Sequence, residues 1–156
     1  MNEPILIAET LVNVPVGFAL AWFLALADYP ERYAFDTHAG FVFTQGEFAE
    51  PGSRFQTEER FAGFLKLVLK FELTEVEDRR FSFDLLTPVR DIWGAFELEP
   101  ASRKTTHLRL AVGSHRSFQR RLLGLPPVRG VVQHQIEGEV THISKSMVSL
   151  YQAGEE

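Results

Sequence analysis

The sequence is 156 residues long, which predicts one domain over residues 1–156, large enough to bury about two thirds of its unfolded surface. It contains no cysteine, which excludes disulfides, thiolate nucleophiles and cysteine-based zinc sites. The net charge of −5 is the sum of +7 over residues 100–136, which hold no Asp or Glu, and −12 over the remainder. Such a basic block attracts anionic head groups, nucleic acid or an acidic partner, or is simply a solvated face.

The N-terminal part predicts one strand and two helical segments. The strand covers residues 5–13 and stops at Pro15, and an apolar helix follows over residues 16–27. That helix is too short to span a bilayer, and Glu3 and Glu9 precede it instead of the basic residues of a signal peptide. A short helix or turn is expected over residues 30–35. We therefore expect a soluble cytoplasmic protein.

Six further strands are expected from residue 40 to residue 113. Between residues 64 and 76 the alternation is regular, with Leu67, Leu69 and Phe71 on one face and Lys66 and Lys70 on the other. One apolar and one polar face are typical of an antiparallel sheet with one solvated side. The six predicted strands cover residues 40–45, 54–61, 64–76, 81–86, 91–99 and 105–112.

The C-terminal part predicts helices. Residues 117–123 form a short basic helical piece, Pro126 and Pro127 break the chain, and a long helix covers residues 128–152. Its apolar residues recur every three or four positions, which makes one stripe for packing against a sheet. The order of elements predicts an α+β helix-grip fold: a curved seven-stranded antiparallel sheet around a long C-terminal helix, two short helices after the first strand, and a cavity between sheet and helix.

Several short motifs resemble the Bet v 1-like superfamily, also called START, polyketide cyclase-like or SRPBCC. They include the strand into Val14-Pro15, the helix with Ala21-Trp22-Phe23, and the last hairpin with its Phe96-x-Leu98-x-Pro100 and Thr105-Thr106-His107-Leu108-x-Leu110 segments. Asp28-Tyr29-Pro30 is similar to the coenzyme Q-binding branch. The resemblance implies the helix-grip fold, which hosts carriers, cyclases, dehydratases, hormone receptors and chaperone activators.

The expected function is binding of a hydrophobic small molecule, such as a lipid, a quinone or a polyketide-like aromatic. Fourteen phenylalanines predict either a Phe-rich core or a Phe-lined pocket. The five histidines are scattered, so no metal site is expected, and no motif indicates a cofactor. The residues expected to line the cavity are Thr57, Phe61, Leu67, Leu69, Phe71, Phe83, Phe96, Leu108, Leu110, Ile136, Val140, Ile143 and Met147.

Glu59 is the candidate catalytic residue. It shares a strand face with Phe55, Thr57 and Phe61, so an inward orientation puts a carboxyl group in an apolar cavity. Desolvation of a carboxylate favours its protonated form, which suits general acid or base chemistry or a hydrogen bond to a ligand hydroxyl. The alternative is a solvated position at the mouth. A polyketide cyclase or dehydratase using Glu59 is therefore the second functional hypothesis, and the sequence leaves enzyme and carrier both open.

Other polar residues are expected mainly at the surface. Strict alternation turns Trp93, His107 and Arg109 outward, whereas Glu139 and His142 flank the apolar stripe of the last helix and either reach the cavity rim or lie at the surface.

The segment from Arg120 to Arg129 has two interpretations. It either docks on a membrane or packs as a linker that caps the cavity. The residues expected at a peripheral membrane contact are Arg120, Arg121, Leu122, Leu123 and Leu125. A third hypothesis is an interaction module that uses the basic residues 100–136. Nucleic-acid binding is not expected from an acidic chain without interleaved aromatic and basic residues.

Overall fold

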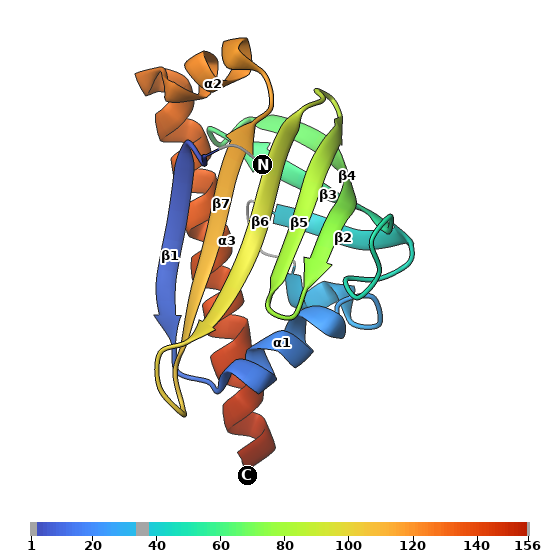
Figure 1. The fold of residues 1–156 in the computed structure, drawn as a ribbon, viewed down its shortest axis with the longest axis vertical. Coiled ribbons are helices and arrows are strands. Elements are labelled where there is room, and N and C mark those ends of the chain that lie inside the picture. Colours follow the sequence, from blue (N-terminus) through green and yellow to red (C-terminus); the bar gives the residue numbers. More distant parts are fainter. Residues whose placement is uncertain (1–2, 34–37, 156) are drawn as a thin grey trace.

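The computed structural model describes residues 3–33 and 38–155 and shows one curved sheet with helices on its concave side (Figure 1). Along the chain, the elements are β1 (Leu6–Val12), α1 (Val16–Leu24), a 3₁₀ helix (Pro30–Tyr33), β2 (His38–Gln45), β3 (Arg54–Phe61), β4 (Leu65–Glu77), β5 (Arg80–Thr87), β6 (Ile92–Pro100), β7 (Thr106–Ser114), α2 (Ser117–Gly124) and α3 (Pro126–Glu155).

The seven strands form one antiparallel sheet in the order β1-β7-β6-β5-β4-β3-β2. Each strand begins and ends within two residues of its predicted range. The first strand closes against the last, with Leu6 opposite Val112 and Val12 opposite Thr106. The fold class predicted from the sequence is confirmed.

Helix α3 lies along the concave side, behind β1 and β7 in Figure 1, and packs mainly against β1. Its predicted apolar stripe is buried, and Ile143 and Met147 have no exposed surface. Helix α1 supplies Phe23 to the same core, where its ring lies 5.0 Å from that of Phe96 and 5.4 Å from that of Phe81. Aromatic pairs at these distances add about 0.5–1.5 kcal/mol to the effect of burial alone.

The helix boundaries differ from the prediction at two places. Helix α1 ends at Leu24 and the chain turns at residues 25–28, so the apolar run to residue 27 is only partly helical. Helix α3 begins at Pro126, because a proline in the first helical turn lacks only an N–H that would have no intrahelical partner. Leu125, with extended backbone angles, separates α2 from α3. Part of the predicted 30–35 segment, from residue 34 on, lies outside the described residues.

The outward residues of β6 and β7 are less solvated than alternation suggests. Trp93 is only 2% exposed, because its indole lies over Gly113, where an added Cβ would come within 2.6 Å of the ring. Arg109 and His107 are half-buried on the same side and lie near carboxylates, with His107 Nε2 3.0 Å from Glu9 Oε2. Within residues 3–33 and 38–155, no helix combines the length and apolar character needed to cross a membrane.

Candidate ligand cavity

A cavity of about 220 Å³ lies between the sheet and α3. This volume is slightly below the ~300–1,000 Å³ of typical ligand pockets, which favours a compact ligand. Most of the lining is aromatic or aliphatic and comes from β2 to β7. The predicted residues that line it are Thr57, Glu59, Phe61, Leu67, Leu69, Phe71, Phe83, Phe96, Leu110 and Ile136.

Four residues predicted for the lining lie instead in the solid core. Leu108, Val140, Ile143 and Met147 are buried in the main hydrophobic cluster and do not border the cavity. Helix α1 explains the difference, because it packs against β6 and α3 and fills the space between sheet and helix at that end. The Phe-rich composition therefore supplies both a core and a cavity wall.

Polar side chains gather on one side of the cavity, where β3 faces α3. Glu59 and Glu139 are 4% and 7% exposed, and their carboxyl groups are hydrogen-bonded to each other. Thr57 Oγ1 donates to Glu59 Oε2 at 2.6 Å, and Gln135 Nε2 donates to Glu59 Oε1 at 3.3 Å. On the other side of the pair, the Tyr33 hydroxyl donates to Glu139 Oε2 at 3.2 Å. Glu59 therefore points into the cavity. Of the two orientations considered from the sequence, this is the inward one and not the solvated position at the mouth.

The Glu59–Glu139 pair must hold a proton, since a hydrogen bond between two carboxyl groups needs one. Burial, followed by the charge of Glu59 and the hydrogen bond to it, raises the pKa of Glu139 well above its ordinary value. Both carboxyl oxygens of Glu59 already accept a hydrogen bond, one from Thr57 and one from Gln135. We therefore assign the shared proton to Glu139.

Tyr33 stays protonated beside this pair. Burial, with the negative charge of the Glu59–Glu139 pair, raises the pKa of its phenol well above the ordinary value. The site thus presents a proton donor and a proton acceptor side by side, which can bind a ligand hydroxyl or carbonyl or exchange protons with a bound molecule.

Three members of this polar group were not among the predicted site residues. Glu139 was expected at the rim or surface and is buried, while Gln135 and Tyr33 were not singled out. The available signal was the spacing of Gln135 and Glu139, which are four residues apart and therefore on one helical face, directly beside Ile136 and Val140. His142 lies elsewhere: its Nε2 is 3.1 Å from the Arg32 carbonyl oxygen, and burial lowers its pKa.

The cavity reaches solvent at one end of the sheet. Pro88 and Val89 in the β5–β6 turn line the cavity and are themselves exposed. Leu123 of α2 is 6% exposed and also lines it, so this residue caps the cavity. The prediction that Leu123 contacts a membrane is therefore wrong, because its side chain is buried. The other residues predicted for this contact are more accessible: Arg121, Leu122 and Leu125 are exposed, and Arg120 is half-buried. Among the described residues, no group of three or more His, Asp or Glu is arranged to hold a metal ion.

No family model and no curated protein matches the sequence, but solved structures do. Norcoclaurine synthase from Thalictrum flavum, solved with a transition-state analogue, has a TM-score of 0.71 at 9% identity over 97% of this chain and 95% of its own. A protein from Thermus thermophilus has a TM-score of 0.67 at 15% identity over 93% of this chain and 97% of its own.

The di-domain ARO/CYC protein BexL, from the BE-7585A biosynthetic pathway, has a TM-score of 0.60 at 11% identity over 92% of this chain and 51% of BexL. At these sequence identities, the three similarities show a shared fold and nothing about function.

Proposed function

We propose that this chain, which has the helix-grip fold of the Bet v 1-like superfamily, binds a small hydrophobic molecule between its sheet and α3. One observation carries the proposal: an apolar cavity of about 220 Å³ contains a buried, hydrogen-bonded pair of carboxyl groups. Buried polar groups that face a cavity fix the orientation of a ligand whose remaining contacts are apolar.

The proposed ligand combines a flat apolar body with one polar group. Phe55, Phe71 and Phe83 line the cavity, and their rings lie within 5.0–5.7 Å of one another, which suits contact with an aromatic or conjugated system. A carbonyl would accept the proton of Glu139, and a hydroxyl would donate to Glu59. A quinone, which has carbonyl groups, or a polyketide-like aromatic, which has carbonyl or hydroxyl groups, combines a flat apolar body with such a polar group. A plain acyl chain is not flat.

A second candidate function is a polyketide cyclase or dehydratase, favoured by the carboxyl pair itself. In a dehydration, Glu59 would take a proton from carbon and Glu139 would give its proton to the departing hydroxyl, which leaves as water. The two carboxyl groups exchange roles, so the step balances without a further reactant. BexL, one of the structural neighbours, carries the designation ARO/CYC.

Ligand binding is tested by native mass spectrometry of the purified protein and organic extraction of any bound molecule. Fluorescence of anilinonaphthalene sulfonate gives a second measurement of cavity occupancy. Leu67→Trp fills the cavity and should abolish binding of this dye. Val68→Trp is the matched control, because Val68 is the next residue of β4, half exposed on the other face. Equal dye binding by these two variants would contradict the proposal.

Glu59→Gln separates enzyme from carrier once a bound molecule has been identified. Retained binding with loss of turnover supports the cyclase or dehydratase function. Unchanged handling of the molecule, with no product formed by either protein, leaves binding as the function.

A further inference from the structure

The two most exposed large apolar side chains lie beside segments that line the cavity. Phe64 and Phe118 are 82% and 75% exposed, the highest values for such side chains among the described residues. Four other large apolar side chains, three beside Phe64 or Phe118 in the chain and one in the β5–β6 turn, are between 41% and 51% exposed. We call this set the mouth surface: Phe64 in the β3–β4 turn, Leu65 at the start of β4, Val89 in the β5–β6 turn, and Phe118, Leu122 and Leu125 in and after α2.

The segments that carry the mouth surface meet at one end of the molecule. Phe61 and Leu67, on either side of the β3–β4 turn, line the cavity together with Val89 and with Leu123 of α2. In Figure 1, α2 and the β5–β6 turn lie at the top, at the end of the sheet opposite the C-terminus. A molecule that enters the cavity from this side therefore passes the mouth surface.

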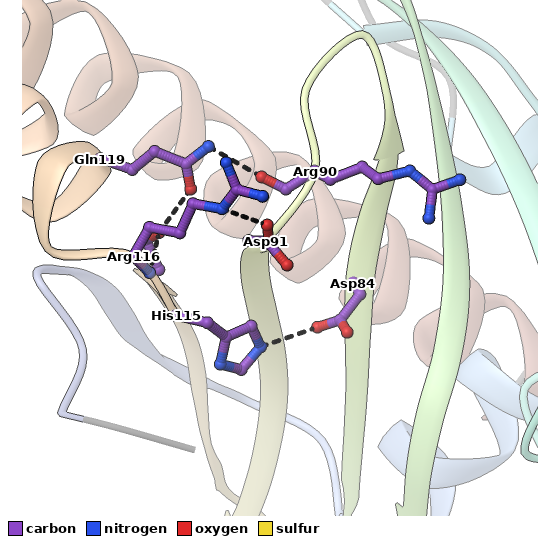
Figure 2. A network of polar contacts seen from close by, with 7 residues as sticks. Asp84, Arg90, Asp91, His115, Arg116 and Gln119 are labelled. Atoms are coloured by element: carbon purple, nitrogen blue, oxygen red, sulfur yellow. Dashed lines mark hydrogen bonds and ion pairs between the residues drawn. The ribbon is translucent and has the colours of Figure 1, made fainter.

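Hydrogen bonds and an ion pair fix α2 to the β5–β6 turn (Figure 2). Gln119 Nε2 donates to the Arg90 carbonyl at 2.8 Å, and Arg116 Nε lies 2.5 Å from Asp91 Oδ2. His115 Nε2 is 3.4 Å from Asp84 Oδ1 on the neighbouring β5. These contacts connect the N-terminal end of α2 to the sheet, while Phe118 and Leu122 of the same helix are exposed.

The charge around the mouth surface is positive. Arg121 and Arg129 are exposed beside it, in a stretch without any acidic residue from 100 to 136. Two acidic residues near it are paired with cations: Asp91 with Arg116, and Glu58 with Lys66. Protruding aromatic and leucine side chains next to arginines are what a protein needs to insert shallowly into a bilayer that carries anionic head groups.

We propose that the mouth surface docks on an anionic lipid bilayer, with the cavity opening turned toward the membrane. Phe64 and Phe118 insert between the acyl chains while Arg121 and Arg129 contact phosphate and carboxylate groups. Docking in this orientation gives an apolar ligand a path between bilayer and cavity that avoids water. The inference concerns the outside of the opening and holds whichever molecule occupies the cavity.

Co-sedimentation of the full chain with vesicles tests the proposal. We expect binding to phosphatidylcholine vesicles that contain phosphatidylserine, and weak binding to pure phosphatidylcholine. Phe64→Ser combined with Phe118→Ser should lower the vesicle partition coefficient by more than about tenfold, since two inserted rings are lost. Arg121→Glu should lower it by about tenfold, since reversal removes one cation and adds one anion.

Two controls match these variants at the opposite end of the molecule. Leu11→Ser removes a side chain that is 63% exposed on β1, and Arg103→Glu reverses an exposed charge of the same basic stretch in the β6–β7 turn. Both should bind vesicles like the unchanged protein. Dye binding in the cavity should stay normal in all four variants, which separates this proposal from the proposed function.

Two results would overturn the docking proposal. One is a folded protein that ignores anionic vesicles, which would point instead to an acidic protein partner for the basic stretch. The other is equal loss of vesicle binding in the mouth-surface variants and in the two controls.

Discussion

The carboxyl group of Glu59 on β3 is hydrogen-bonded to that of Glu139 on α3, so one shared proton links the sheet to the long helix. Both side chains are buried at the cavity wall. Loss of this proton would leave two like charges in a poorly solvated place, which is unfavourable. The protonation of the pair therefore influences both the stability of the fold and the chemistry of the cavity.

Stability should decrease as the pH rises through the raised pKa of Glu139. The folded state holds a proton that the unfolded chain releases near the ordinary value of 4.5, so the free energy of unfolding is highest below that value and falls above it. Glu139→Gln replaces the protonated carboxyl by an amide and should flatten this decrease. Urea unfolding of both proteins between about pH 5 and about pH 8 measures the difference.

Glu137→Gln is the control for this pH experiment, because Glu137 lies on the same helix and is exposed. It should retain the slope of the unchanged protein. The same slope in Glu139→Gln would show that the carboxyl pair does not bind its proton more tightly in the folded state.

Thr57→Val should destabilise the protein by about 1–3 kcal/mol, because it removes a buried donor from Glu59 without changing the side-chain volume much. Thr74→Val on β4 is a matched exposed substitution and should change the free energy of unfolding by less than about 0.5 kcal/mol. Chemical denaturation measures both. A Thr57 variant as stable as the Thr74 variant would mean that the 2.6 Å hydrogen bond contributes nothing net.

Gly94→Ala should cost about 1–3 kcal/mol, because the added Cβ would lie 2.5 Å from the ring of Phe83, a buried residue of the cavity wall. The ring has to move, so the dye affinity of the cavity should change as well. Gly130→Ala on α3 meets no atom within 4 Å and should be neutral or stabilising by up to about 1 kcal/mol. Equal stability of these two variants would refute the close packing of Gly94 on Phe83.

Phe23→Ala should cost about 3–5 kcal/mol, because its ring is fully buried among Phe48, Phe81 and Phe96. Phe118→Ala, at 75% exposure, should leave the free energy of unfolding within about 0.5 kcal/mol of the original value. Thermal and urea unfolding check both variants. A large loss of stability in Phe118→Ala would assign this residue to the core rather than to the mouth surface.

The fold could be predicted from the sequence because its signals are local. Leu67, Leu69 and Phe71 alternate with charged residues, and the apolar residues of α3 recur at helical spacing, so strands, helix and their order follow directly. Glu59 could be singled out because it shares a face with Phe55 and Phe61.

The partners of Glu59 could not be predicted in the same way. Tyr33 reaches the pair from a 3₁₀ turn and Glu139 from the distant α3, and periodicity does not say which polar residues beside an apolar stripe become buried. The position of α1 could not be predicted either, and it decides that Leu108 and Met147 belong to the core rather than to the cavity.

The pairing of β1 with β7 sets the order in which the protein can assemble during synthesis. Leu6 pairs with Val112, so β1, which is made before the other six strands, has no partner in the sheet until β7 has been made. The hairpins from β2 to β6 have neighbours close in sequence and can form earlier, whereas closure by β1 and α3 depends on contacts between distant residues, which form slowly. The apolar side chains of Leu6, Ala8 and Val12, which are buried in the folded protein, therefore stay without their partner strand until late in synthesis, and exposed apolar segments of this kind favour aggregation.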